Sequence, residues 1–147
     1  MTSWKQLQIT SSTKADSTGA ITGVLHEEFA GCYATDDTLA DGLFSAGEAV
    51  GERLWRLPLS DSQDYLVDSD AADVSNFGAL GFLGVAGGSP TAGAKFLQRF
   101  VPGARWAHLD IAGTAWATRR TTLSGEGATG FGVRLLDSRV SSLESSH

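Results

Sequence analysis

The stretch Trp106-Ala107-His108-Leu109-Asp110-Ile111-Ala112-Gly113 decides the fold class of this chain. Large apolar residues alternate in it with small or polar ones, which is the pattern of a half-buried strand, and the run stops at a glycine. We therefore expect a strand over residues 106–111 that ends beside a site. A second strand is predicted from Phe29 to Ala34, where aromatic and small residues also alternate.

Two helices are predicted between these strands. An apolar stripe with spacings of three and four begins after an N-cap at Thr35 or Asp36 and runs to about Arg53. The residues of this stripe are Leu39, Leu43, Ala46, Val50 and Leu54. Ser89-Pro90 starts the second helix, and Pro102-Gly103 ends it.

The remaining segments give less regular patterns. Residues 1–17 are polar and are expected to form an unrelated or loosely ordered leader, although Trp4, Leu7 and Ile9 leave a short edge strand open. The other expectations are a short helix before residue 28, a polar loop over 114–125, a Gly-rich turn entering a last helix or strand over 127–136, and a frayed tail over 138–147. The expected fold is thus a single α/β domain over residues 18–137, with a mixed sheet flanked by helices.

Composition excludes several functional classes. The chain has 147 residues and a net charge of −6, so it lacks the basic stripe that nucleic-acid binding needs. No apolar run reaches the roughly 20 residues of a membrane span, and residues 1–17 hold no apolar segment of a secretory signal. The single Cys32 excludes an internal disulfide and a cysteine-rich zinc site. We expect a cytoplasmic location without nucleic-acid or membrane partners.

Two histidines could carry chemistry, and each has a plain structural alternative. His108 and Asp110 share one face of the predicted strand, either as a pair that awaits a serine nucleophile or as core residues satisfied by their neighbours. The sequence contains no Gly-x-Ser-x-Gly nucleophile elbow, which favours the core interpretation. His26 beside Glu27 and Glu28 is either a weak metal site or an exposed charged turn.

Acidic and glycine-rich segments add few functional candidates. Five aspartates without the spacing of a calcium loop indicate a solvated helical segment: Asp61, Asp64, Asp68, Asp70 and Asp73. The segment 74–88 is rich in glycine but has no phosphate-binding motif, so nucleotide binding is not expected. Arg53 and Arg56 are expected to form ion pairs with Glu48 and Glu52 on a helix surface.

Seven sequence blocks follow one another over residues 18–132. They are Thr18-Gly19-Ala20; Ala30-Gly31 with Thr35-Asp36-Asp37; Gly47-Glu48 and Gly51-Glu52 with Trp55-Arg56-Leu57-Pro58-Leu59; Ala72-Asp73-Val74-Ser75-Asn76-Phe77-Gly78; Thr91-Ala92 with Phe96-Leu97 and Phe100-Val101; Trp106 to Gly113; and Gly127 to Gly132. Taken together and in this order, the blocks resemble the leucyl aminopeptidase family, also called cytosol aminopeptidases, which are two-metal exopeptidases. One block alone would be a weak signal, whereas the ordered set is specific.

The resemblance implies a fold and a site. The chain is similar to the C-terminal part of the aminopeptidase catalytic domain, whose family reaction is the metal-dependent release of N-terminal amino acids from peptides. In the family, the positions that match Thr18, Gly19, Ala112 and Ala115 border the bound substrate, so these are the expected substrate-pocket residues. The family uses two divalent ions, zinc or manganese, and forms hexamers, which implies a peptide substrate and a possible homo-oligomer.

The sequence departs from the family in its metal-binding part. The family's Lys/Asp motifs and its Asn-Thr-Asp-Ala-Glu-Gly-Arg motif do not occur, Ser17 stands where the family has Leu, and the loop over 78–89 is several residues longer. We therefore expect no catalytic residue and no metal ligand in this chain, and leave open whether it is an enzyme. The chain is expected to be inactive in isolation. The alternative is a non-catalytic binding or assembly module derived from the same fold.

Overall fold

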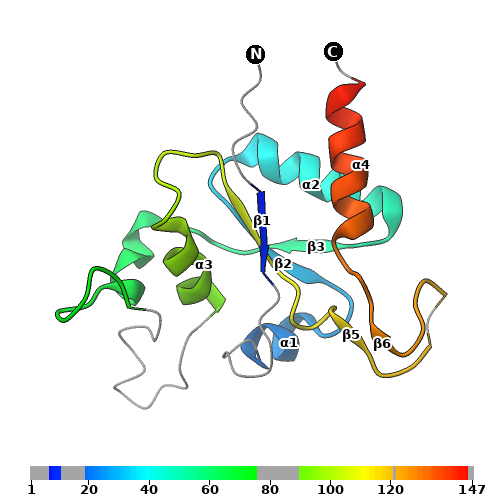
Figure 1. Cartoon of the computed structure of the whole chain (residues 1–147), viewed down its shortest axis with the longest axis horizontal. Helices are drawn as coiled ribbons and strands as arrows, with labels where there is room; N and C mark the ends of the chain where they lie inside the picture. The colour runs from blue at the N-terminus through cyan, green and yellow to red at the C-terminus, as the bar shows by residue number, and fades with distance from the viewer. Residues whose placement is uncertain (1–6, 11–18, 76–89, 121, 146–147) are drawn as a thin grey trace.

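A four-stranded mixed sheet organises the chain (Figure 1). The computed structural model describes residues 7–10, 19–75, 90–120 and 122–145. Its strands run in the order β1-β4-β2-β3, with bounds Leu7–Thr10 for β1, Ala107–Asp110 for β4, Ala30–Ala34 for β2 and Leu54–Arg56 for β3. Strand β4 pairs in parallel with β1 and antiparallel with β2, which pairs in parallel with β3. The short edge strand that the sequence left open near Leu7 is β1.

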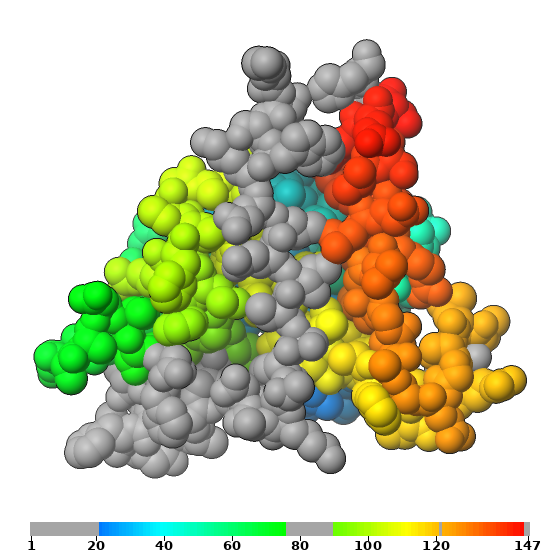
Figure 2. Space-filling model, in the orientation of Figure 1, coloured from blue at the N-terminus to red at the C-terminus, as the bar shows by residue number. Residues whose placement is uncertain are grey.

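Helices cover both faces of this sheet. Their bounds are Gly19–Leu25 for α1, Asp37–Val50 for α2, Pro90–Gln98 for α3, Val133–Glu144 for α4 and Asp61–Val67 for the 3-10 helix η1. A small hairpin joins β5, Trp116–Ala117, to β6, Gly127–Ala128. In Figure 2, α4 and this hairpin form one side of the visible face, and α3 with η1 forms the other. None of the described helices combines the length and apolar character that crossing a bilayer requires.

The two-residue period of β4 divides the core into two layers. Ala107 and Leu109 pack with α2 and α4, in a cluster that includes Leu43 and Leu135. Trp106 points to the opposite face, where it packs with residues of α3 and of the loop that follows it. His108 and Asp110 lie on the face of Trp106, because side chains two positions apart share a face.

Helix α2 begins as predicted and ends earlier than predicted. The Asp36 side chain accepts a hydrogen bond from the Leu39 amide at 2.7 Å and caps the first turn. The helix ends at Val50 instead of Arg53, because Gly51 adopts a left-handed conformation with φ of 73° that closes the last turn. Leu54, expected on the helical stripe, therefore lies in β3 beside Ala30.

Helix α4 extends through residues that were expected to fray. Residues 138–144 continue the helix to Glu144. Leu135 is fully buried in the α2-α4 layer, and the guanidinium of Arg139 lies over Gly42 of α2. Packing against α2 thus supports a Ser-rich segment that has little helical preference of its own. The polar loop expected over 114–125 likewise contains β5, whose partner β6 lies after it.

Candidate functional site

The 112–115 loop, which directly follows β4, forms the candidate site. The Ile111 carbonyl accepts the amides of Thr114 at 3.0 Å and Ala115 at 2.8 Å, and also the Thr114 hydroxyl at 3.2 Å. The Ala112 amide donates to Asp110 Oδ1 at 3.1 Å. These bonds close a tight turn in which the small side chains of Ala112 and Ala115 are half-buried.

Helix α1 packs directly on this loop. A Cβ atom added to Gly113 would collide with the carbonyl oxygen of His26 and would lie 3.6 Å from the Cα of Thr22. His26 ends α1 in a left-handed conformation, with φ of 54°. Gly19 starts the same helix one turn before Thr22. The structure therefore brings the Gly19 helix against the loop of Ala112 and Ala115, whereas Thr18 lies outside the described residues.

The 129–132 turn supports the loop from its other side. Thr129 donates its amide to the Ala115 carbonyl at 3.0 Å and its hydroxyl to the Thr114 carbonyl at 2.7 Å. The same hydroxyl accepts the Phe131 amide at 3.2 Å. Both donors of one threonine thus bind consecutive carbonyls of the loop.

Glu52 anchors this turn to the α2-β3 connection. Its side chain is 2% exposed and accepts the amides of Gly132 at 3.0 Å and Leu135 at 2.9 Å, together with the Arg134 guanidinium at 3.1 Å. Because Gly132 has no side chain to cap α4, the buried carboxylate satisfies the first helix amides in its place. Glu52 was predicted in a surface ion pair, since no local pattern shows a cap that comes from 80 residues away.

Other charged side chains form ion pairs on the surface, only one of them with a partner that the sequence predicted. Arg53 pairs with Glu48 as predicted, and also with Glu28. Arg56 pairs with Asp37 at 3.1 Å, and not with Glu48 or Glu52. His26 is exposed at the end of α1.

His108 has the surroundings of a core histidine. It lies between the rings of Trp106, stacked at a centroid distance of 6.0 Å, and Tyr33, at 5.9 Å. Burial lowers the pKa of His108 from 6.5 to about 4, so the imidazole is neutral at physiological pH. Burial raises the pKa of Asp110, and the Ala112 amide opposes that shift. One oxygen of Asp110, Oδ2, is buried without a hydrogen-bond partner among the described residues.

The described residues do not fit a two-metal centre. Within the described ranges, no three side chains among His, Cys, Asp and Glu come together as metal ligands would. Two carboxylates of the acidic segment pair with cations: Asp64 with the buried Lys95 at 2.7 Å, and Asp68 with Arg99 at 2.9 Å. Both pairs tie η1 to α3.

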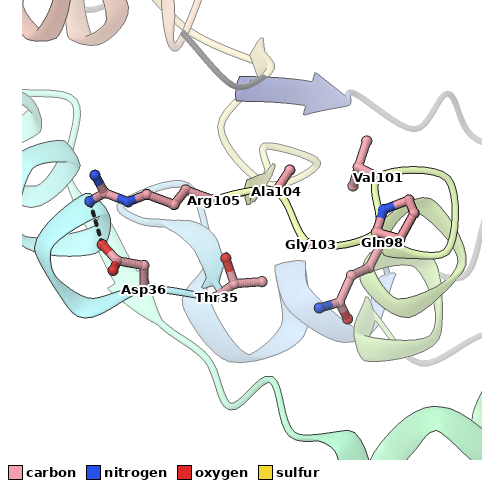
Figure 3. A pocket seen from close by; sticks show the side chains of 8 residues that line it. Thr35, Asp36, Gln98, Val101, Gly103, Ala104 and Arg105 are labelled. Atoms are coloured by element: carbon pink, nitrogen blue, oxygen red, sulfur yellow. Dashed lines mark hydrogen bonds and ion pairs between the residues drawn. The ribbon is translucent and has the colours of Figure 1, made fainter. Parts of the chain in front are cut away.

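A separate cavity of about 340 Å³ lies at the opposite end of β4 (Figure 3). It is lined by Thr35, Asp36, Gln98, Val101, Pro102, Gly103, Ala104 and Arg105. The Arg105 guanidinium pairs with Asp36 and, with the Leu39 amide, lowers the pKa of that carboxyl. The Thr35 hydroxyl is bound to the backbone of Trp106. This cavity was not predicted from the sequence, and several of its polar groups are already paired within the chain.

Comparison with known proteins connects this geometry to a family. A sequence model described as the cytosol aminopeptidase family, catalytic domain, matches residues 11–137. The chain belongs to the cytosol aminopeptidase family. It is 50% identical over 121 residues to the cytosol aminopeptidase of Rickettsia prowazekii (strain Madrid E), and 47% identical over 131 residues to a probable cytosol aminopeptidase of Ehrlichia ruminantium (strain Gardel).

Solved structures confirm the predicted α/β fold of this cytosol aminopeptidase family chain. A mutant of tomato leucine aminopeptidase aligns with a TM-score of 0.70 and 37% identity, covering 84% of this chain and 22% of that protein. The bottromycin maturation enzyme BotP in complex with Mn aligns with a TM-score of 0.78 and 31% identity, covering 93% of this chain and 28% of that enzyme. The two bacterial alignments cover 82% and 88% of this chain but 23% and 25% of the relatives. The chain thus spans about a quarter of their length.

Proposed function

We propose that this chain forms the apolar wall of a peptide-binding pocket of the cytosol aminopeptidase type, with Gly19, Ala112 and Ala115 beside the N-terminal residue of the peptide. The observation that carries the proposal is the tight 112–115 loop, whose Gly113 lies against α1 and whose alanine side chains are small and half-buried. Small side chains leave room for a large apolar group of the ligand. Thr18 completes the proposed set by its resemblance to the family position.

We further propose that the isolated chain does not hydrolyse peptides. In the family, two divalent ions, zinc or manganese, polarise the peptide and activate water. Asp64 and Asp68 pair with cations, Glu52 caps a helix, and the sequence contains none of the family's metal-binding motifs. Since its relatives are named cytosol aminopeptidases, we infer a cytoplasmic location.

Binding and hydrolysis are tested separately. Nuclear magnetic resonance titration with leucinamide should shift the methyl signals of Ala112 and Ala115, while leucyl peptide hydrolysis with added Mn²⁺ or Zn²⁺ should stay at the background rate. Ala115→Leu should fill the space and weaken binding about tenfold or more. Ala49→Leu makes the same change at an exposed position of α2 and should leave binding unchanged. Absence of any shift contradicts the pocket, and metal-dependent turnover contradicts the inactivity.

A second candidate function is an assembly module. Trp116, Leu123 and Val133 are 64%, 59% and 69% exposed around the hairpin and the start of α4. Large apolar side chains gathered on a surface are typical of protein interfaces. This function predicts a homo-oligomer in light scattering that Trp116→Ser disrupts. A monomer at all concentrations would count against it.

A further inference from the structure

We propose that Thr129 is a positioning residue of the pocket, which holds the 112–115 loop against α1 so that the apolar wall is formed before a ligand binds. This inference rests on the proposed function. It assigns a role to a residue outside the loop, on the connection between β6 and α4.

Thr129 is hydrogen-bonded to both the 112–115 loop and its own turn. Its amide and hydroxyl donate to the carbonyls of Ala115 and Thr114, at 3.0 and 2.7 Å, and its hydroxyl accepts the Phe131 amide. The hydroxyl is thus donor and acceptor at once, a combination that serine can reproduce and valine cannot. Without the hydroxyl, the Thr114 carbonyl loses its donor and the Phe131 amide loses its acceptor.

Two fixed segments contact the 112–115 loop. On one side, Gly113 touches the carbonyl of His26, so the loop cannot move toward α1 without a collision. On the other side, the 129–132 turn is fixed by Glu52, whose carboxylate accepts the Gly132 and Leu135 amides. The loop is therefore held between α1 and a turn that is anchored to the far end of α2.

A loop held in one conformation binds without the cost of ordering it, and it discriminates between apolar groups of different size by its fixed shape. A loosened loop would still present Ala112 and Ala115, but it would adapt to smaller groups. Thr129 should thus control the preference for leucyl over alanyl ligands more than it controls folding.

The test compares Thr129→Val, which keeps the size and removes the hydroxyl, with Thr129→Ser, which keeps the hydroxyl. Thr118→Val is the matched control, because Thr118 is exposed just after β5. Amide hydrogen exchange of residues 114, 115 and 131 reports on the loop without any ligand. The ratio of the dissociation constants of leucinamide and alaninamide reports on selectivity.

In Thr129→Val, we expect these amides to exchange on the order of tenfold faster than in the wild type. We also expect the ratio of dissociation constants that favours leucinamide to fall from about tenfold to about threefold. Thr129→Ser and Thr118→Val should match the wild type in both. Glu52→Gln is a second loosening variant, because it weakens the hydrogen bonds that fix the 129–132 turn while Thr129 stays intact. It should also speed the amide exchange and reduce the selectivity for leucinamide.

Unchanged selectivity in both loosening variants, when the wild type binds leucinamide, would overturn the positioning role whatever the exchange rates show. If the wild type binds neither leucinamide nor alaninamide, the proposed function itself is contradicted, and the positioning role, which depends on it, is contradicted as well. The two failures are therefore distinguished by the wild-type titration alone.

Discussion

His108 makes the stability of this chain depend on pH through a single buried ring. Its pKa is about 4 in the folded chain, against 6.5 for the unperturbed group, because burial disfavours the charged imidazolium. As pH falls below 6.5, His108 is therefore protonated in the unfolded chain while it stays neutral in the folded chain. Between pH 7.5 and pH 5 this difference should remove about 2 kcal/mol of unfolding free energy.

The measurement is urea unfolding at both pH values for the wild type and for His108→Phe, which retains an aromatic ring beside Trp106 and Tyr33. The variant should lose about 2 kcal/mol less than the wild type over this range. Asp110 acts in the opposite sense, because its raised pKa lets the folded chain bind a proton first as pH falls. Asp110→Asn should therefore steepen the loss. Equal losses in wild type and His108→Phe would show that the imidazole is solvated.

Among the elements, α2 offers a matched pair of glycines. A Cβ at Gly47 would collide with the backbone carbonyl of Glu52, and it would lie 3.1 Å from Leu135 Cδ1. At Gly42 the three atoms nearest the added Cβ all belong to the guanidinium of Arg139, which is the end of a flexible side chain. Gly47 thus permits the close approach that places Glu52 under α4, whereas Gly42 does not constrain the backbone.

Gly47→Ala should lower the unfolding free energy by about 2 kcal/mol or more, because the carbonyl of Glu52 has no room to move. Gly42→Ala should change it by less than about 1 kcal/mol, since the gain in helix propensity offsets the displaced arginine. Both values come from urea unfolding followed by circular dichroism. A Gly47→Ala variant as stable as Gly42→Ala would contradict the tight crossing of α2 and the 52–54 segment.

The same elements show which features a sequence can and cannot predict. Strand β4 and the start of α2 follow from local alternation and from a cap at Asp36, three residues from its partner. Strand β3 was missed because Leu54 continues the helical stripe, and only the backbone of Gly51 interrupts it. In the candidate site, Gly19, Ala112 and Ala115 came from a family resemblance. Thr129 and Glu52 depend on contacts between distant segments, which no periodicity encodes.

At the scale of the whole molecule, the sheet separates two core layers that share no helix in the described part of the chain. The α2-α4 layer contains Leu43 and Leu135, and the α3 layer contains Ala94 and Trp106. Both layers use the same strands, since alternate residues of β4 point into one or the other. Loss of packing on either face should therefore release β4 and unfold both layers together.

Leu135→Ala tests this coupling because Leu135 is fully buried and contacts only the α2-α4 side of the sheet in the described clusters. The substitution should cost about 3 kcal/mol through lost burial and a residual cavity. Urea unfolding followed at the Leu43 and Ala94 methyl signals reports on each layer separately. Both signals should lose the same free energy, although Ala94 lies across the sheet from the change. Val140→Ala on the exposed side of α4 should alter neither by more than about 0.5 kcal/mol. If the unfolding midpoint at Ala94 kept its wild-type value while the midpoint at Leu43 shifted, the two layers would unfold independently. The sheet would then not transmit stability between the α3 face and the α2-α4 face, which holds Glu52 and the 129–132 turn.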